Sequence, residues 1–321
     1  MDPLFINKER VASLLPMNEC IEVMEKMFRS LANGEATQPL RSLMWLPEKN
    51  GLLGMMPGHS GSLGVMGIKT ITVFHANREQ GLPSHQGIVI LFEAKYGTPL
   101  MLFDAAEITA IRTAAASAVA TRLLSRKNAE TLAIIGSGEQ AKKHIEAILL
   151  VRQIKQINIW SRTKKNAEDL AAKTLSLHKI PVQVNETVKE AVNNANIICT
   201  VTSSKEPLVM GEWVKPGAHI NAVGSSIAVA RELDTNTVAK SKLFTDCYES
   251  LFNEAGDFLI PKKEGAVTDE HVKAEVGEVL LGQKKGREND EEITLFKSLG
   301  IAMEDILSAY HIYQKLNQQQ S

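Results

Sequence analysis

A glycine-containing turn between an expected strand and an expected helix constrains this chain more than any other feature. Residues 130–135 end in the apolar run Leu132-Ala133-Ile134-Ile135, which is typical of a buried strand, and the turn Gly136-Ser137-Gly138-Glu139-Gln140-Ala141 follows at once. Gly136 suits a backbone turn that most residues resist, and Gly138 leaves room for a phosphate at a helix N-terminus. Ala141 fits the position where such a helix packs closely on its strand. The turn alone also occurs in other strand-to-helix joints, so the surrounding sequence must decide.

The segment after this turn supports a dinucleotide site. Residues 141–150 are expected to be helical and residues 157–160 to form a second strand, which completes a strand-helix-strand unit of about 30 residues. A carboxylate after that strand would select NAD through the ribose 2′-hydroxyl. This chain has Ser161-Arg162-Thr163 there, and a guanidinium with two hydroxyls suits the 2′-phosphate of NADPH. The alternative is a solvated basic turn, because Lys164 and Lys165 come next.

Composition excludes several classes of partner. Lys and Arg number 36 against 37 Asp and Glu, so no broad basic field attracts nucleic acid or an anionic membrane. The length of 321 residues fits about two domains. Cys20, Cys199 and Cys247 are widely spaced and odd in number, which indicates reduced thiols rather than a disulfide framework or a zinc site. We expect a cytoplasmic protein, since the first residues lack a signal-peptide core and no run approaches the ~18 apolar residues of a membrane span.

The first third of the chain has the pattern of an antiparallel sheet. An amphipathic helix over residues 18–33, with Asn18 as its cap and Gly34 as its stop, comes first. Strands with a hairpin turn at residues 95–98 follow, and they are expected over residues 42–46, 51–56, 68–74, 87–93 and 100–103. An alanine-rich helix over residues 105–124 comes next, and Asp104 with Glu107 predicts its capping box.

Beyond that helix, strands alternate with helices, which predicts a doubly wound parallel sheet of the Rossmann type. These strands are expected over residues 132–135, 157–160, 182–184, 197–201, 219–223 and 243–245, with a last one within 292–300. A final helix over residues 301–316 is expected to return to the first domain. The fold class is therefore α/β, with a Rossmann domain over residues 119–299 and a smaller α+β domain formed by residues 1–118 and 300–321.

Three cations stand in or beside apolar segments. Lys69 shares a strand face with Ile71 and Val73, where an ammonium would bind a substrate anion or transfer a proton. A strand-edge lysine that discourages aggregation explains this pattern equally well. Arg112 lies on a helical stripe of small residues and needs an anionic partner, either a ligand or an internal Asp or Glu. Together with Arg41, these cations would form an anion pocket.

Polar residues also stand near strand ends. Ser84 and His85 precede the strand at residue 87, and a lone histidine there is either structural or a cleft residue. Ser226 follows the strand at residues 219–223, and ligands of open α/β sheets lie beyond the carboxyl ends of such strands.

Taken together, these residues resemble the ornithine cyclodeaminase/mu-crystallin family over nearly the whole chain. The blocks that carry the resemblance are Arg112-Thr113-Ala114-Ala115, the turn at residues 136–141, residues 211–224 and residues 296–300. The resemblance implies a homodimer whose first domains pair through their sheets. It also implies that the substrate binds between the first domain and the Rossmann domain.

The resemblance assigns roles to single residues. Arg41, Lys69 and Arg112 would hold the substrate carboxylate. The residues that it places at the cofactor are Ser84, His85, Arg112, Thr113, Gly136, Ser137, Gly138, Glu139, Gln140, Ser161, Arg162, Thr163, Thr202, Val223, Gly224, Ser225 and Ser298. Members that cyclise ornithine carry aspartate at the position of Ser226, and a serine cannot handle the protons of the substrate amine at neutral pH. Ser226 and Ser161-Arg162-Thr163 instead resemble the mu-crystallin-like, NADPH-dependent ketimine reductases.

The sequence therefore predicts a reductase that uses NADPH, with NADH as the second choice. Its substrates would be small imino acids such as pyrroline-2-carboxylate or piperideine-2-carboxylate, and its products L-amino acids. Lys69, Arg112 and Ser226 are the expected catalytic residues, with Lys69 as the proton source. Two alternatives stay open. One is an ornithine cyclodeaminase or an NAD-dependent alanine-type dehydrogenase, and the other is an NADPH-gated ligand-binding protein without turnover.

Overall fold

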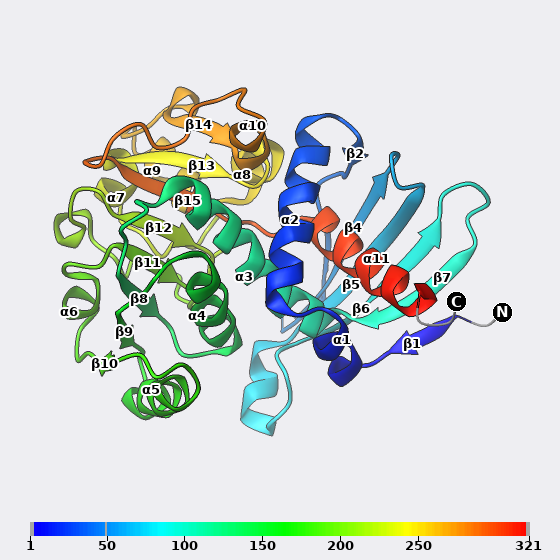
Figure 1. Ribbon diagram of the computed structural model, residues 1–321, viewed down its shortest axis with the longest axis horizontal. Coiled ribbons are helices and arrows are strands. Elements are labelled where there is room, and N and C mark those ends of the chain that lie inside the picture. Colours follow the sequence, from blue (N-terminus) through cyan, green and yellow to red (C-terminus); the bar gives the residue numbers. More distant parts are fainter. Residues whose placement is uncertain (1–2, 49, 319–321) are drawn as a thin grey trace. The chain divides into compact units, whose positions relative to one another are not determined.

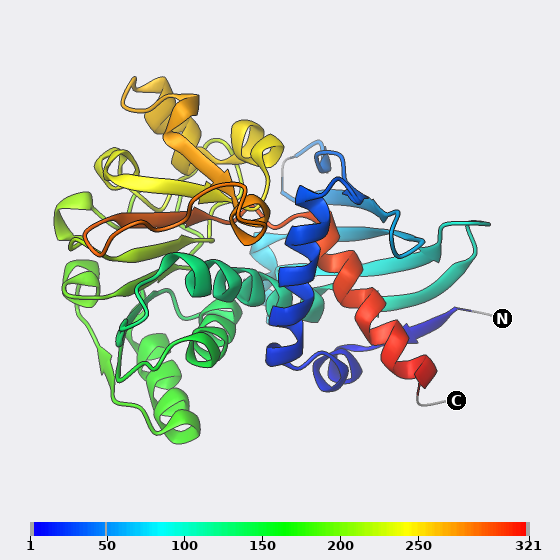
Figure 2. The ribbon, with the colours of Figure 1, turned by 45° about the horizontal axis from the view of Figure 1, so that its top comes forward.

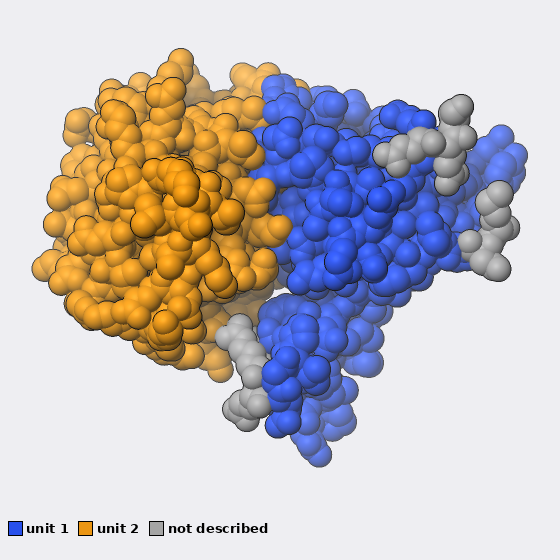
Figure 3. Space-filling model, turned by 60° about the horizontal axis from the view of Figure 1, so that its bottom comes forward, with its two compact units in different colours: residues 1–113, 301–321 blue, residues 114–300 orange. Residues whose placement is uncertain are grey.

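The computed structural model describes residues 3–48 and 50–318 and divides the chain into two compact units (Figure 3). Unit 1 contains residues 1–113 and 301–321, and unit 2 contains residues 114–300. The chain passes from unit 1 to unit 2 within the helix α3 (Ala105–Leu124), whose bounds are those expected. In the part of the chain that the structure describes, no helix is both long and apolar enough to cross a bilayer.

Unit 1 is built on a seven-stranded sheet in the order β1-β7-β6-β5-β4-β2, with β3 paired to β4 (Figure 1). Its strands are β1 (Leu4–Ile6), β2 (Ala36–Thr37), β3 (Ser42–Trp45), β4 (Leu52–Ser60), β5 (Val65–Val73), β6 (His85–Glu93) and β7 (Pro99–Asp104). All pairs are antiparallel except β1 with β7, which confirms the largely antiparallel sheet. The helices are α1 (Lys8–Leu14), α2 (Met17–Ala32) and α11 (Ala302–Gln318), with a short 3-10 helix η1 (His75–Gln80).

Helix α11 covers one face of this sheet, where it contacts β4, β5, β6 and α2 (Figures 1 and 2). Close packing explains two glycines, because a Cβ at Gly58 would lie 2.7 Å from Met303 Sδ and one at Gly67 would lie 2.7 Å from Ile90 O. Asp104 caps α3 by accepting a hydrogen bond from the Glu107 N–H at 2.8 Å.

Several expected details of unit 1 were wrong. The strands β1 and β2 and the helix α1 were missed, since each is too short to show a periodic pattern. Asn18 is not a cap, because Pro16 is the N-cap and places Asn18 in the first turn. The strand expected to end at Met56 runs on to Ser60 through Pro57. This proline is tolerated because it lies between the stretch of β4 that pairs with β3 and the stretch that pairs with β2.

Unit 2 is the expected doubly wound sheet of eight parallel strands, in the order β10-β9-β8-β11-β12-β15-β13-β14. The strands are β8 (Thr131–Ile135), β9 (Gln156–Trp160), β10 (Val182–Val184), β11 (Ile197–Thr200), β12 (His219–Ala222), β13 (Ser241–Thr245), β14 (Val272–Glu275) and β15 (Ile293–Lys297). The helices are α4 (Glu139–Val151), α5 (Lys164–His178), α6 (Val188–Val192), α7 (Thr235–Lys240), α8 (Tyr248–Glu254), α9 (Gly256–Lys263) and α10 (Val276–Leu280), with 3-10 helices η2 (Gly211–Trp213) and η3 (Asp269–His271).

Alternating side chains of the central strands fill two separate cores. On β8, Leu132 and Ile134 pack with α4 and α5, whereas Ala133 and Ile135 pack with the core that contains α6, α7, α8 and α9. The edge strand β14 was missed because Val272-Lys273-Ala274-Glu275 is short and of mixed polarity. The strand order reverses between β8 and β11, and their carboxyl ends form the topological switch point at which open α/β sheets bind ligands.

Candidate functional site

Two buried cations lie on the α11-covered side of the unit 1 sheet. Lys69 is only 2% exposed, and β5 lies between β4 and β6 in the sheet. The alternative of a strand-edge lysine is therefore wrong. Arg112, on α3, is 3% exposed and lies on a helix stripe with the buried Ile108, Ala115 and Val119. Both cations are buried, as the sequence pattern predicts.

The partners of these cations are two carboxylates at the start of α11. Lys69 Nζ lies 2.7 Å from Asp305 Oδ2. Arg112 donates from Nε to Asp305 Oδ1 at 3.0 Å, and its Nη1 contacts Glu304 Oε2. For Arg112, the sequence left open a ligand or an internal Asp or Glu as the anionic partner, and the structure shows that internal acids contact it.

Sequence reasoning missed Glu304 and Asp305, which are both 0% exposed. A signal was present, because two acidic residues interrupt an apolar stretch in the same way that drew attention to Lys69.

Burial and neighbouring charges change the pKa values of both cations. Burial lowers the pKa of Lys69 to about 8, Asp305 opposes this, and the nearby positive charges of Arg112 and Arg41 lower it further. Burial would also lower the pKa of Arg112, but Asp305 and Glu304 outweigh it and raise that pKa. Arg41 is half-buried and directly precedes β3.

Further residues of interest in unit 1 lie on β4, on α3 and at the start of β6. Met56 faces Lys69 across the β4–β5 pair and is buried, which suits an apolar wall. Thr113 follows Arg112 on α3 and is buried. Ser84 directly precedes β6, His85 is its first residue, and Ser84 Oγ is 3.0 Å from His85 Nδ1.

In unit 2 the turn after β8 has the geometry of a phosphate-binding turn. Gly136 has a φ of +131°, and a Cβ there would lie 2.8 Å from Val201 O, so only glycine fits. Gly138 is the N-cap of α4 without a side-chain cap, and the space in front of its Cα is open. Glu139 and Gln140 form the first turn of α4, whose N–H groups and dipole favour an anion. The open space and the glycine cradle fit a dinucleotide pyrophosphate.

The loop after β9 approaches this turn. Ser161 Oγ lies 2.7 Å from Ser137 Oγ, and Thr163 is the N-cap of α5. Lys164 contacts Glu186, and Lys165 Nζ lies 2.9 Å from Asp169 Oδ1. Both lysines are exposed despite these partners, so the alternative of a solvated basic turn stays open. Arg162, between these residues and the strand, is exposed.

A buried carboxylate organises the loops beyond β11 and β12. Glu232 accepts hydrogen bonds from the Thr202 N–H at 2.7 Å, from Thr202 Oγ1 at 2.6 Å and from the Gly224 N–H at 2.7 Å. A Cβ at Gly224 would lie 2.2 Å from Thr202 O, so this residue must be glycine. Burial raises the pKa of Glu232, and Asp257 adds to the shift. These bonds hold Thr202 and the segment from Val223 to Ser226 at the sheet edge where ligands of this fold bind.

A second buried ion pair supports the same segment and was missed from the sequence. Lys297 Nζ lies 2.9 Å from Asp257 Oδ2 and donates to the carbonyls of Ala222 and Ser225. Asp257 in turn accepts the Glu232 and Leu233 N–H groups. The next residue, Ser298, is buried, and its Oγ has no hydrogen-bond partner among residues 3–48 and 50–318. An unsatisfied buried hydroxyl fits the prediction that Ser298 contacts a cofactor.

The three cysteines are free in the structure. Cys20 and Cys199 are buried and Cys247 is half-buried, as expected for thiols outside a disulfide framework. Burial raises the pKa of Cys20 to about 12, which keeps this thiol protonated beside the unit 1 charges.

Comparison with known proteins identifies the family. The model of the ornithine cyclodeaminase/mu-crystallin family matches residues 1–320. The ketimine reductase mu-crystallin of Mus musculus is 37% identical over 315 residues, which cover 97% of this chain and 96% of the relative.

Two solved structures are similar over their full length. The pyrroline-2-carboxylate reductase of Thermococcus litoralis, in complex with NADH and L-proline, superposes with a TM-score of 0.96 at 39% identity and covers 99% of this chain and 98% of the other. An archaeal alanine dehydrogenase, described as a dimer with bound NAD, superposes with a TM-score of 0.94 at 32% identity over 100% and 98% of the two chains. The chain therefore belongs to the ornithine cyclodeaminase/mu-crystallin family, as an NAD(P)-dependent oxidoreductase of the ketimine reductase type.

Proposed function

We propose that this chain reduces small, mainly cyclic imino acids such as pyrroline-2-carboxylate or piperideine-2-carboxylate to L-amino acids, with NADPH as the preferred reductant. The observation that carries this proposal is the buried pair of Lys69 and Arg112. Asp305 and Glu304 contact these two cations and Arg41 adds positive charge near Lys69, so the group offers an ammonium and guanidinium groups that can bind a substrate carboxylate. The names of the mouse and Thermococcus litoralis relatives support the same reaction class.

The residues of unit 2 would hold the cofactor, which supplies a hydride to an electrophilic carbon when bound. The turn at Gly136 and Gly138 with the α4 N-terminus would bind the pyrophosphate. Arg162, with the hydroxyls of Ser161 and Thr163, would bind the 2′-phosphate. The two solved relatives carry NADH and NAD, so the preference for NADPH rests on Arg162 and its neighbours in this chain.

The cations of unit 1 would bind and protonate the substrate. Arg112 and Arg41 would hold its carboxylate and so fix the orientation of its C=N bond. Reduction of that carbon would leave the electron pair of the former C=N π bond on nitrogen. Lys69 gives one proton to this nitrogen, becomes a neutral amine and regains a proton from water. Ser226, which lacks an acidic proton, would donate a hydrogen bond at the substrate and leave proton transfer to Lys69.

A screen of coenzyme oxidation tests the reaction class. Purified protein would be supplied with cyclic and linear imino acids, each with NADPH and with NADH. We expect the highest kcat/KM for a cyclic imino acid with NADPH. Ammonia release from ornithine, or NAD-dependent oxidation of alanine, at a higher kcat/KM than any imine reduction would contradict the proposal. Tight ligand binding without coenzyme oxidation across the whole screen would instead support a binding protein.

Arg162→Ala tests the coenzyme preference. Loss of a charge-assisted contact worth about 1.5–3 kcal/mol lowers kcat/KM for NADPH about 10- to 100-fold and leaves the value for NADH nearly unchanged. The matched control is Lys165→Ala on the next helix, since this lysine is exposed and paired with Asp169. Equal losses with both coenzymes in Arg162→Ala would contradict the assigned role.

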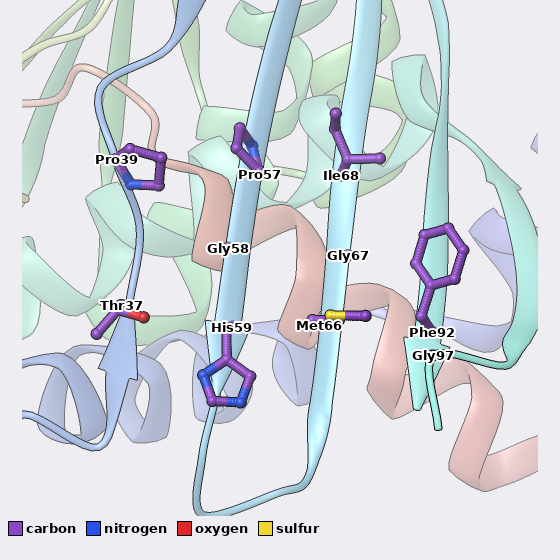
Figure 4. Close-up of a pocket in the computed structure, with 10 residues that line it drawn as sticks. All are labelled: Thr37, Pro39, Pro57, Gly58, His59, Met66, Gly67, Ile68, Phe92 and Gly97. Carbon is purple, nitrogen blue, oxygen red and sulfur yellow. The ribbon is translucent and has the colours of Figure 1, made fainter. Parts of the chain in front are cut away.

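We also propose that the chain forms a homodimer through the unit 1 sheet. The face opposite α11 carries an open, mainly apolar groove of about 420 Å³ (Figure 4). Pro57, Met66, Ile68 and Phe92 line it from β4, β5 and β6. An apolar face of this kind suits a second copy, and the archaeal relative is described as a dimer.

Ile68→Lys tests this face. It is expected to convert the dimer to a monomer, whereas Leu177→Lys on the exposed side of α5 is the matched control. Light scattering on both variants gives the masses. A wild-type monomer, or a dimer that survives Ile68→Lys, would contradict the proposal.

A further inference from the structure

The start of α11 provides both carboxylates that contact the unit 1 cations. Asp305 is shared, since its Oδ1 lies 3.0 Å from Arg112 Nε and its Oδ2 lies 2.7 Å from Lys69 Nζ. Glu304 contacts Arg112 Nη1. Thr109 completes the contacts of Lys69, with Oγ1 at 3.4 Å from Nζ and at 3.4 Å from Asp305 Oδ1. The two neighbouring acids therefore share Arg112, but Asp305 is the carboxylate against Lys69.

Apart from Asp305 and the Thr109 hydroxyl, the neighbours of Lys69 in the described part of the chain are cationic or apolar. Arg112 from α3 and Arg41 before β3 are positive, and both lower the pKa of Lys69. Its neighbours across the sheet are Met56 on β4 and Val89 on β6, which are both buried. Without a carboxylate, an ammonium in this position would be desolvated beside two guanidinium groups and would lose its proton.

We propose that Asp305 is a positioning residue that keeps Lys69 protonated and aimed at the substrate, while Glu304 serves Arg112. This inference rests on the proposed role of Lys69 in imine reduction. It adds a division of labour between two adjacent acids on α11. It also explains why α11, from the far end of the chain, must pack under β5 for the site to work.

The pair offers a matched experiment, Asp305→Asn against Glu304→Gln. The readout is the pH dependence of kcat/KM for imine reduction, which reports groups of the free enzyme. Activity that needs the Lys69 ammonium falls on the alkaline side, around the Lys69 pKa of about 8. Removal of an opposite charge at this distance shifts a pKa by about 1–3 units. In Asp305→Asn, the alkaline limb of the profile, where kcat/KM falls as pH rises, is therefore expected at a pH lower by that amount.

The control separates the two acids. Glu304→Gln is expected to raise the KM for the imino acid through Arg112 and to leave the alkaline limb within about half a unit of wild type. Asp305→Glu keeps the negative charge. Its alkaline limb is expected to lie close to the wild-type pH, with a reduced kcat. An alkaline limb that is unchanged in Asp305→Asn, or equally displaced in both variants, would overturn the inference.

A second readout keeps the inference separate from the proposed function. Carbon-13 NMR of labelled lysine side chains, assigned by the signal missing in Lys69→Met, gives the Lys69 titration directly. If wild type reduces no imino acid, the proposed function fails, but this titration still shows whether Asp305→Asn lowers the Lys69 pKa. An unchanged titration overturns the inference whatever the activity.

A double variant covers the case in which Asp305→Asn does not fold. The inference requires that Lys69→Met, which removes the uncompensated ammonium, restores folding to Asp305→Asn. Failure of the double variant to fold would show that Asp305 is needed for Arg112 alone, and would overturn the inference.

Discussion

Lys69 in unit 1 and Lys297 in unit 2 are both buried lysines on apolar strands, but their partners differ. Lys69 is held by a side-chain carboxylate of Asp305 and by the Thr109 hydroxyl. Lys297 contacts Asp257 and also donates to two backbone carbonyls, those of Ala222 and Ser225. Lys69 therefore belongs to a group of interacting side chains, whereas Lys297 holds backbone segments together.

The carboxylates differ in the same way. Asp305 contacts side chains of other elements, whereas Asp257 and Glu232 accept backbone N–H groups from the loops beyond β11 and β12. Charges that bind backbone stabilise one loop conformation. Charged side chains that contact only other side chains can also contact a ligand. In this group, burial lowers the pKa of Lys69 to about 8. Burial alone therefore does not mark a functional lysine, and its partners must be known.

The largest effect that we expect from this comparison is on the stability of Lys297→Met. Loss of this ammonium leaves Asp257 buried without its cation, which lowers the free energy of unfolding by about 3–5 kcal/mol. Urea unfolding measures the loss, and Lys273→Met at the exposed position on β14 is the control. A loss below about 1 kcal/mol would remove the structural role given to Lys297.

Glu232→Gln is expected to have an intermediate effect. A glutamine offers one acceptor oxygen and turns its NH₂ group toward a backbone N–H, so one loop contact at Thr202 or Gly224 is lost. We expect unfolding to become easier by about 1–3 kcal/mol, together with a higher KM for the coenzyme. The control is Glu206→Gln, at an exposed position in the loop after β11, and wild-type stability and coenzyme KM in Glu232→Gln would refute the assignment.

The smallest effect on stability is expected for Lys69→Met, despite equal burial. Burial outweighs the attraction of Asp305, so the ammonium is costly in the fold, and Arg112 still pairs with Asp305 in the variant. We expect the free energy of unfolding at neutral pH to change by less than about 1 kcal/mol, while imine reduction is lost. Destabilisation as large as that of Lys297→Met would erase the contrast between the two lysines.

The same variant has a pH signature. Because the pKa of Lys69 is lowered from 10.5 to about 8, the unfolded chain binds more protons than the folded chain between these values. Wild-type stability therefore rises with pH across this window relative to Lys69→Met, by at most about 1.4 kcal/mol per pH unit. Urea unfolding of both proteins at a series of pH values measures the difference. Parallel curves would show that the Lys69 pKa is not lowered.

Most of the fold follows from the sequence because its patterns are local. The alternation of strands and helices in unit 2 and the turn at Gly136 and Gly138 depend on neighbouring residues, and both were predicted. The extension of β4 through Pro57 was not, since it depends on where β3 ends and β2 begins. The short elements β1, α1 and β14 are formed by tertiary pairing and packing.

The candidate site was predicted only in part for the same reason. Lys69 and Arg112 stand out locally, as charges within apolar patterns. Their shared partner Asp305 lies 193 residues from Arg112 in the sequence. A local spacing of residues cannot indicate a pair so far apart. Lys297 and Asp257 belong to strand and helix patterns that looked complete without them.

The most direct test of the central claim compares two substrates that differ in one group. Wild-type kcat/KM with NADPH would be measured for pyrroline-2-carboxylate and for pyrroline, which has the same ring and C=N bond but no carboxylate. The account predicts that pyrroline is reduced about 100- to 10,000-fold less efficiently, since it forgoes two charge-assisted contacts worth about 1.5–3 kcal/mol each. It also predicts that Arg112→Lys narrows this gap. Equal efficiency with both substrates would contradict the assignment of the buried cations to the substrate carboxylate.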